Sequence, residues 1–204
     1  MNEQRFFFES LPTPTGTIFL VTDERERLFA LDWEDCAERT HRLLRRHYGV
    51  ERARLEANPC VSHSRLAIEA YFAGQFAAID ALEVAIGGTG FQREVWVALR
   101  TIPLGKTVSY GQLAAQLGRP KAIRAVGMAN AANPVAIVVP CHRVIGANAT
   151  LTGYAGGLER KRWLLAHEGV ILTEPRRASN GLDGTNNRSR RAPRQMPSAG
   201  AGIR

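Results

Sequence analysis

An apolar run at residues 135–139 (Val-Ala-Ile-Val-Val) leads directly into Pro140, Cys141, His142 and Arg143. The β-branched residues of this run predict a buried β-strand. A thiol at the exit of a buried strand is held in one place, and the residue after it is a histidine, whose side chain titrates near neutral pH. The chain therefore places a candidate nucleophile, Cys141, beside a candidate base, His142.

The composition predicts an ordinary soluble protein. With 204 residues and 45% hydrophobic content, the chain can bury the core of one large domain or two small ones. Its three cysteines are far apart, which argues against a disulfide framework and for a reducing compartment. The histidines show no zinc-like spacing with them, so we expect no metal ion and no cofactor, although spacing does not test a dispersed site. No apolar stretch has the length of a signal peptide or a membrane span, so we expect a cytoplasmic protein, nuclear if eukaryotic, without a membrane partner.

The net charge of +8 is divided unevenly along the chain. Residues 1–90 carry 10 basic and 14 acidic residues, whereas residues 91–174 carry 10 and 4, and residues 175–204 carry 7 and 1. The basic second half is typical of a segment that meets a polyanion. Charge alone leaves a second interpretation open, namely that the arginines only keep the protein in solution.

The first half of the chain predicts a β-meander followed by helices. A Pro- and Gly-containing turn at residues 12–16 precedes two apolar segments that flank a charged turn. We expect strands at residues 17–22, 28–33 and 81–86, and helices at residues 34–48 and 62–72. No catalytic spacing occurs here, and Cys36 and Cys60 are interpreted as packing or surface thiols.

The second half begins after Gly87 and Gly88 with two capping boxes. Thr89 with Gln92, and Ser109 with Gln112, match the pattern in which the first side chain and the fourth cap each other's backbone N–H groups. We expect helices at residues 90–102, 109–117 and 121–130, the last with Pro120 in its first turn. The second and third of these, joined by a turn that contains Gly118, predict a helix-turn-helix.

The third of these helices carries mostly small side chains, with Lys121 and Arg124 as its main projections. A thin helix with one long cation suits the narrow DNA minor groove. The other interpretation, tight packing within the protein, stays open on this evidence. A loop of small residues at 145–157 follows the cysteine, then a last helix at 158–168 that Gly169 ends, and beyond residue 174 the composition predicts disorder.

Six segments together resemble one family. They are Ser109-Tyr110-Gly111, residues 121–127 (KAIRAVG), Asn133-Pro134, residues 140–146 (PCHRVIG), residues 153–157 (GYAGG) and residues 164–169 (LLAHEG). In this order, over residues 89–171, they resemble the O6-alkylguanine-DNA alkyltransferases. The first half resembles that family's ribonuclease H-like N-terminal domain only loosely.

The resemblance implies an α/β (α+β) fold of two domains. A ribonuclease H-like domain with a β-meander would occupy residues 1–88, a winged-helix-like alkyltransferase and DNA-binding domain with the helix-turn-helix residues 89–174, and a disordered basic tail residues 175–204. It also implies direct-reversal DNA repair, in which O6-alkylguanine, or O4-alkylthymine, is flipped out of the duplex and its alkyl group passes to Cys141. The resulting thioether offers water no carbonyl to attack, so each molecule should react once.

The resemblance also assigns roles to single residues. Cys141 would accept the alkyl group, His142 would activate it through a water, Glu168 would orient His142, Tyr110 would rotate a phosphate and donate a proton, and Asn133 would join the helix-turn-helix to the cysteine segment. For Glu168 the sequence gives independent support, because a carboxylate in the last turn of a helix opposes the helix dipole, at a typical cost of ~0.3–1 kcal/mol. A charge in an unfavourable place indicates a function, although a solvated surface glutamate remains an alternative.

The implied DNA contacts and base pocket are built largely from small residues and backbone. The DNA-binding residues would be Gln92, Tyr110, Gly111, Arg119, Arg124 and Ala147, with Arg124 filling the gap that the flipped base leaves. The base pocket would be formed by Val144, Tyr154 and Ala155. In it the carbonyls of Cys141 and Val144 would face the exocyclic amine of guanine, and the Ala155 amide would face O6. Two positions depart from the family pattern, because Ala149 replaces a common glycine and Ala147 lacks a polar side chain. The expected partner is the minor groove of double-stranded DNA with an alkylated guanine, bound by a monomer.

Three other functions compete with this interpretation. A non-catalytic sensor of alkylated bases would lack the acceptor thiol that Cys141 supplies. A cysteine hydrolase would need an oxyanion hole, and a Cys and a His adjacent in sequence do not readily form its direct ion pair. A structural winged-helix DNA-binding protein would leave residues 140–143 unexplained.

Overall fold

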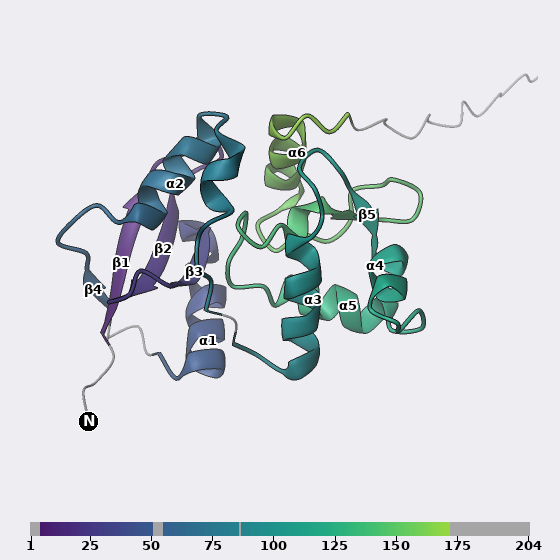
Figure 1. Cartoon of the computed structure of the whole chain (residues 1–204), viewed down its shortest axis with the longest axis horizontal. Coiled ribbons are helices and arrows are strands. Elements are labelled where there is room, and N and C mark those ends of the chain that lie inside the picture. Colours follow the sequence, from purple (N-terminus) through teal and green to yellow (C-terminus); the bar gives the residue numbers. More distant parts are fainter. Residues whose placement is uncertain (1–4, 51–54, 86, 172–204) are drawn as a thin grey trace, which may run out of the picture.

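The structure is a computed structural model that describes residues 5–50, 55–85 and 87–171. The disordered tail expected at residues 175–204 therefore lies outside the described residues. Figure 1 shows two halves side by side, an N-terminal half with a sheet and a C-terminal half made mostly of helices. The expectation of a mixed fold with a β-meander followed by a helix-turn-helix is confirmed.

The N-terminal half is built on a four-stranded sheet with the order β3-β2-β1-β4. Strands β1 (Phe6–Leu11), β2 (Ile18–Asp23) and β3 (Leu28–Trp33) are antiparallel neighbours, and β4 (Leu55–Ala57) runs parallel to β1. Every residue of β2 and β3 is buried, because helices and the C-terminal half cover this part of the sheet. The predicted β-meander is thus present.

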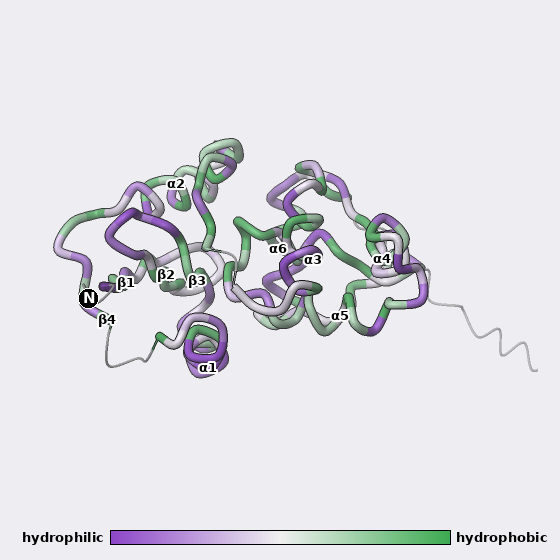
Figure 2. Tube along the Cα trace, turned by 60° about the horizontal axis from the view of Figure 1, so that its bottom comes forward, coloured by the Kyte–Doolittle hydropathy of each residue, from purple (hydrophilic) through white to green (hydrophobic). Residues whose placement is uncertain are grey.

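Two helices pack on this half. A 3-10 turn (Glu34–Cys36) leads into α1 (Ala37–Tyr48), and Ser62 caps α2 (His63–Phe72), which a second 3-10 turn (Phe76–Ile79) follows. Figure 2 shows that α1 is mainly hydrophilic, and only Thr40 and Leu44 of this helix are buried. The strand expected at residues 81–86 is wrong over its described part, because residues 81–85 join the sheet through a single bridge between Leu28 and Val84.

Both capping boxes of the C-terminal half are formed as predicted. Thr89 and Gln92 cap α3 (Gly90–Arg100), and Ser109 and Gln112 cap α4 (Tyr110–Gln116). The next helix, α5 (Ile123–Ala131), starts later than the sequence predicts. Its expected first turn is instead a loop turn, closed by a hydrogen bond of 2.8 Å from the Ala122 N–H to the Arg119 carbonyl. Helices α4 and α5 form the helix-turn-helix, and β5 (Val108–Ser109) pairs in parallel with β6 (Val144–Ile145) beside them.

The apolar run at residues 135–139 is buried, but it is not a strand. It makes one bridge, between Val135 and Leu31, and then turns at Ile137, whose φ of 69° lies in the left-handed region. The segment then enters a short 3-10 turn at Cys141–Arg143. The burial of the run was predicted correctly and its backbone conformation was not.

The last helix, α6 (Leu158–His167), packs in the C-terminal half and ends at Glu168, with Gly169 at φ 80° after it. One hydrophobic core runs through both halves and includes Leu31, Val95 and Leu164. Residues 135–139 and Cys141 belong to this shared core, so both halves surround the cysteine. Within the described residues no helix is both long and apolar enough to cross a membrane.

Candidate active site

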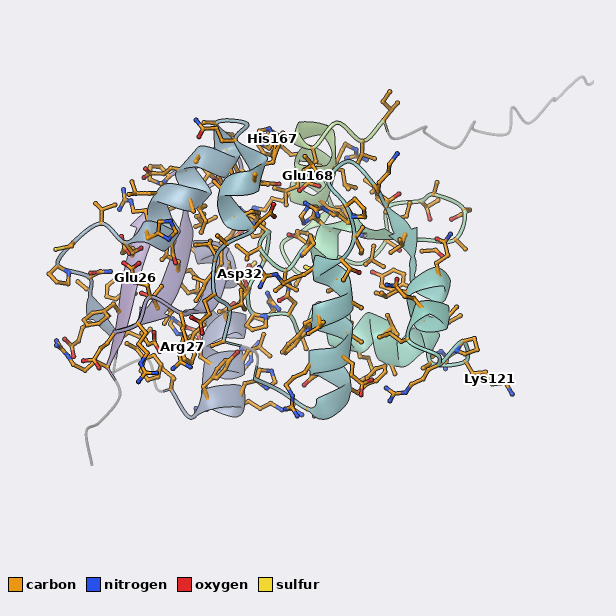
Figure 3. The ribbon with its side chains drawn as sticks, viewed as in Figure 1. Glu26, Arg27, Asp32, Lys121, His167 and Glu168 are labelled. Carbon is orange, nitrogen blue, oxygen red and sulfur yellow. The ribbon has the colours of Figure 1, made fainter. Side chains whose placement is uncertain are left out.

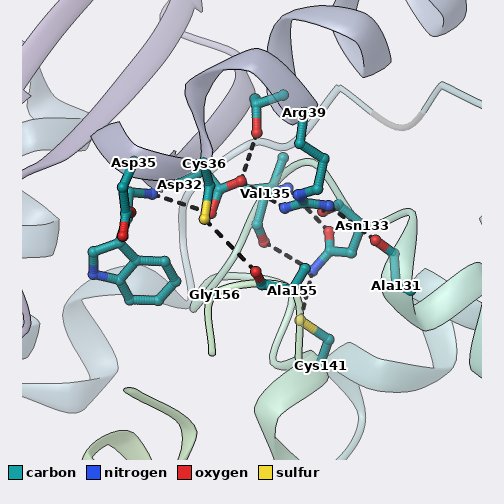
Figure 4. Close-up of polar contacts among 12 residues, drawn as sticks. Asp32, Asp35, Cys36, Arg39, Ala131, Asn133, Val135, Cys141, Ala155 and Gly156 are labelled. Carbon is teal, nitrogen blue, oxygen red and sulfur yellow. Dashed lines mark hydrogen bonds and ion pairs between the residues drawn. The ribbon is translucent and has the colours of Figure 1, made fainter. Parts of the chain in front are cut away.

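Cys141 lies in a turn whose backbone is held by one asparagine. Asn133 Nδ2 donates to the carbonyls of Val135 and Val139, at 3.2 and 2.9 Å, and lies 3.2 Å from the Cys141 Sγ, while its Oδ1 accepts from the Val135 N–H at 3.0 Å. Figure 4 shows these contacts converging on Asn133. Together with backbone bonds within the turn and to Leu31, this side chain supplies the hydrogen bonds that a sheet would otherwise give to a buried segment. The turn can therefore be buried without being a strand.

Glu168 is the centre of a buried cluster at the C-terminal end of α6, where Figure 3 labels it. Its carboxylate accepts hydrogen bonds from His142 Nε2 at 3.0 Å and from the Tyr71 hydroxyl at 2.9 Å. Arg143 donates to both oxygens, Nε at 2.8 Å and Nη2 at 2.9 Å. Burial favours the neutral acid, but the hydrogen bonds from His142 and Arg143 and the positive charge of Arg143 outweigh it and lower the pKa of Glu168 to about 2.

The neighbouring histidine is arranged to act as a neutral base. Burial lowers the pKa of His142, against the opposing influence of Glu168. Because the ionised Glu168 can only accept, Nε2 of His142 carries the ring proton and Nδ1 keeps its lone pair. Nδ1 is buried and makes no hydrogen bond to the described protein atoms. Burial also raises the pKa of the Cys141 thiol, with the hydrogen bond from Asn133 opposing this, so the thiol needs a base to react.

A buried lysine holds the loop that follows the cysteine. Lys161 Nζ donates to the carbonyls of Val144, at 2.6 Å, and Thr152, at 2.8 Å. Burial lowers the pKa of Lys161 to about 8. Across the loop, the Tyr110 hydroxyl donates to the Gly153 carbonyl at 3.3 Å, so α4 and α6 both contact residues 144–153. Within this loop Ala149 has a φ of 59°, a conformation that favours glycine.

The N-terminal half also reaches the cysteine. Arg39 on α1 donates to the carbonyls of Ala131, at 2.9 Å, and Asn133, at 3.4 Å, and to Asp32 Oδ2 at 2.5 Å. Asp32, labelled in Figure 3 near the centre of the molecule, also accepts from the Thr40 hydroxyl. A cavity of about 10 Å³ beside Cys141 is lined by residues of both halves. They are Asp32, Trp33, Arg39, Asn130, Asn133, Ala136, Cys141, Tyr154, Ala155 and Gly156.

The helix-turn-helix exposes both polar and apolar side chains to solvent. Arg124 is exposed on α5, next to the exposed apolar side chains of Ile123 and Met128. Arg119 is also exposed, but it pairs with Glu94 and lies over the ring of Phe91 at 5.1 Å. The Gln92 side chain is used in capping α3, Gly111 lies in the first turn of α4, and Ala147 is exposed in the loop. No cluster suited to a metal ion occurs among the described residues.

Comparison with known proteins matches both halves of this arrangement to one family. The model described as "6-O-methylguanine DNA methyltransferase, DNA binding domain" matches residues 90–170. The model described as "6-O-methylguanine DNA methyltransferase, ribonuclease-like domain" matches residues 7–86. The chain belongs to the 6-O-methylguanine DNA methyltransferase family. The family expected from the sequence motifs is thereby confirmed, and so is the ribonuclease H-like N-terminal domain, which those motifs indicated only loosely.

The relatives described next, from the 6-O-methylguanine DNA methyltransferase family, match this chain over almost their full length. The methylated-DNA–protein-cysteine methyltransferase of Salmonella typhimurium is 58% identical over 171 residues, which cover 82% of this chain and 98% of that protein. The crystal structure of Mycobacterium tuberculosis OGT in complex with DNA is similar, with 40% identity, a TM-score of 0.66, and coverage of 79% of this chain and 92% of that one. The methyltransferase of Pyrococcus kodakaraensis, at 23% identity and a TM-score of 0.59, shares the fold.

The structure brings together four of the five residues named as catalytic from the sequence. Asn133 contacts Cys141, and His142, next in sequence, contacts Glu168. Tyr110 reaches the same loop from α4, without a hydrogen bond to the other four among those described. The residues that sequence reasoning missed are Asp32, Arg39, Tyr71, Asn130, Arg143 and Lys161. Arg143 lies within the motif at residues 140–146, where a basic residue after an apolar run was the available signal, whereas Lys161 lies between Arg160 and Arg162 and its sequence context gave no such signal.

Proposed function

We propose that this chain repairs alkylated DNA by moving the alkyl group from O6 of guanine to the sulfur of Cys141. Transfer from methylated DNA to a protein cysteine is the activity for which its relatives are named. The observation that carries the assignment to Cys141 is its position, bonded to Asn133 and preceding a buried His142–Glu168 pair. Cys36, which is partly exposed, and Cys60, which is exposed, have no such neighbours in the described chain.

The reaction would begin with removal of the thiol proton. Nδ1 of His142 is the available base, and a bridging water would carry the proton to it. The thiolate then attacks the alkyl carbon, so that the S–C bond forms while the C–O6 bond breaks. The leaving guanine takes up a proton, for which Tyr110 is the proposed donor. Glu168 stabilises His142 when it becomes charged, as an orienting carboxylate does in other Cys-His and Ser-His sites.

Recognition of DNA would use the helix-turn-helix. The structure of the M. tuberculosis relative was solved in complex with DNA, which supports DNA as the partner of this chain. The exposed Arg124 on a helix of small residues supports minor-groove binding, with Arg124 occupying the space of the flipped base. Tyr110 and Gly111 lie on α4, which packs on α5, and Ala147 lies in the loop after β6; all three are proposed to contact the same duplex. In the free protein the Gln92 side chain caps α3 and Arg119 forms an ion pair with Glu94. Contact between Arg119 and DNA would require this ion pair to break.

The base itself would enter beside Cys141, between Tyr154, Ala155 and Val144. The cavity there is about 10 Å³, which is close to the space of one water and far smaller than a purine. The loop at residues 145–157 would therefore move to admit the base.

We further propose a monomer in the cytoplasm, or in the nucleus of a eukaryote, with its domain boundary at residues 88–89. Light scattering with and without a short duplex checks the oligomeric state.

The stoichiometry of repair tests the proposal. A fixed amount of duplex with one O6-methylguanine is titrated with protein, and restored guanine is counted after the reaction has stopped. We expect one restored guanine per protein molecule, none with Cys141→Ala, and an unchanged value with Cys60→Ala. Several restored bases per molecule, or full repair by Cys141→Ala, would overturn the proposal.

A further inference from the structure

Tyr71 reaches the active site from the N-terminal half of the protein, and none of the reaction steps proposed above uses it. It lies near the C-terminal end of α2, is fully buried, and donates from its hydroxyl to Oε1 of Glu168 at 2.9 Å. Burial and the charge of Glu168 raise the pKa of Tyr71, so the hydroxyl keeps its proton at acid and neutral pH. Tyr71 is therefore a permanent donor to the carboxylate that holds His142.

Two consecutive residues at the end of α6 fix the position of Tyr71. Glu168 accepts from the Tyr71 hydroxyl, and Nε2 of His167 donates to the Tyr71 backbone carbonyl at 2.9 Å, since a carbonyl can only accept. The rings of Tyr71 and His167 pack edge to face with their centroids 5.4 Å apart, and Phe72 and Phe76 contact the Tyr71 ring at 5.4 and 5.6 Å. The hydroxyl is thus held against Glu168 by packing between the two halves.

Three donors share one oxygen of Glu168. Oε1 accepts from His142 Nε2 at 3.0 Å, from the Tyr71 hydroxyl at 2.9 Å and from Arg143 Nη2 at 2.9 Å. A carboxylate oxygen offers about two lone-pair sites, so the three donors compete for it. The positive ends of these donors also repel one another. Tyr71 therefore weakens the attraction between Glu168 and a charged His142.

The other charges around His142 do not depend on Tyr71. Arg143 and Lys161 lower the pKa of His142, as burial does, and Glu168 raises it. Helix α3 also packs against the turn at residues 141–143, and the charged side chains of α3 and α2 bond elsewhere. Arg93 bonds to Gly88, Arg100 to Asp80 and Leu82, Glu94 to Arg119, and Arg65 to Glu69. Removing the Tyr71 hydroxyl therefore alters the bonds to Glu168 without removing a charge.

We propose that Tyr71 is a positioning residue, whose hydroxyl competes with His142 for Glu168 and so keeps His142 a neutral base. A protonated ring has no lone pair with which to take the thiol proton of Cys141, so a neutral His142 is required for the reaction. The N-terminal half thereby sets the pH range in which Cys141 reacts. The link to alkyl transfer rests on the proposed function, whereas the protonation of His142 is measured without DNA.

Tyr71→Phe removes only the hydroxyl. The pKa of His142 is measured in the free protein by NMR of its ring Cε1–H, with the signal assigned through His142→Asn, across the pH range in which the protein is folded. In Tyr71→Phe we expect this pKa to rise by about one unit, the lower end of the change that a neighbouring charge causes. The acid limb of the single-turnover rate of methyl transfer should move to higher pH with it.

Tyr48→Phe is the matched control in the same half. The Tyr48 hydroxyl donates to the Ala85 carbonyl and accepts from the Gly87 N–H, so its loss removes two hydrogen bonds away from Cys141. This variant should leave the pKa of His142 and the acid limb unchanged. A purely structural role of Tyr71 would slow transfer in Tyr71→Phe at every pH without moving the acid limb.

A second replacement tests the opposite direction and keeps the fold if Tyr71→Phe is unstable. Incorporation of 3-fluorotyrosine at position 71 retains the ring and makes the hydroxyl a stronger donor, so the pKa of His142 should fall. An unchanged pKa of His142 with either replacement in the folded protein would overturn the inference. Failure of the unmodified protein to methylate Cys141 would instead overturn the proposed function, whatever the titration of His142 shows.

Discussion

His142 and Glu168 form a buried hydrogen bond of 3.0 Å between Nε2 and Oε1, and neither side chain has any exposed surface. The carboxylate remains ionised because Arg143 and Tyr71 donate to it as well. This contact selects the tautomer of His142 that leaves Nδ1 as a base. The orientation of the proposed base therefore depends on a residue 26 positions away in the sequence.

Glu168→Gln should impair both folding and reaction. The substitution keeps the volume but leaves the Arg143 charge buried without its partner, so we expect a loss of about 3 kcal/mol in the free energy of unfolding. Methyl transfer should slow because the amide stabilises the charged His142 less well. Urea denaturation and single-turnover kinetics measure the two effects. Glu159→Gln on the same helix, where the side chain is 91% exposed, should change stability by less than about 0.5 kcal/mol.

At acid pH the free energy of unfolding should fall, because the Glu168 carboxylate becomes protonated. Its pKa in the folded protein, about 2, is lower than the ordinary value of 4.5, so the unfolded chain binds a proton more readily. The stabilisation is complete above about pH 4.5 and is lost as the pH falls towards 2, because the folded carboxylate is then protonated too. Denaturation curves between pH 6 and pH 3 should show this decline, and Glu168→Gln should reduce its slope. Equal slopes for the two proteins would contradict this assignment of the pKa.

Ala149→Gly should stabilise the loop beside the site. Ala149 has a φ of 59°, where a Cβ is unfavourable by roughly 1–2 kcal/mol, and glycine avoids this cost while adding some entropy to the unfolded chain. We expect a net gain of about 0.5–1 kcal/mol in the free energy of unfolding. Thermal or urea denaturation measures it. Ala147→Gly, two residues earlier and without a positive φ, should destabilise slightly, and a gain at both positions would argue against strain at Ala149.

Arg124→Ala should affect DNA repair without affecting folding. Arg124 is exposed, and its removal should leave the melting temperature unchanged within about 1 °C. If Arg124 fills the space of the flipped base, methyl transfer from duplex DNA should slow by at least about tenfold, while transfer from the free base O6-benzylguanine should be unchanged. Arg162→Ala, which removes another exposed arginine, is the control for charge. Equal slowing with duplex and free base would contradict this role.

Local sequence signals predicted the local parts of the fold. The capping boxes at Thr89 and Ser109 each depend on only four consecutive residues, and both are formed. The run at residues 135–139 was assigned to a strand because its composition reports burial but not the source of its hydrogen bonds. Those hydrogen bonds come partly from the side chain of Asn133 and partly from backbone bonds within the turn and to Leu31. The positive φ of Ile137 is likewise set by tertiary contacts and has no signal in the residue type.

The same limit applies to the site. Cys141, His142 and Glu168 were found because their motifs are specific, and Glu168 also because it opposes the helix dipole. Asp32 and Arg39, from the other half of the chain, line the cavity beside the cysteine, and Tyr71 reaches Glu168 across 97 positions. A single sequence carries no signal that brings such distant residues together.

Peptide mapping of the alkylated protein tests the central claim most directly. The protein is mixed with duplex DNA that bears O6-methylguanine, digested, and analysed by mass spectrometry for the three cysteine-containing peptides. We predict one methyl group on the peptide with Cys141, and none on those with Cys36 or Cys60. A methyl group on either of the other cysteines, or repaired DNA with all three unmodified, would contradict the account.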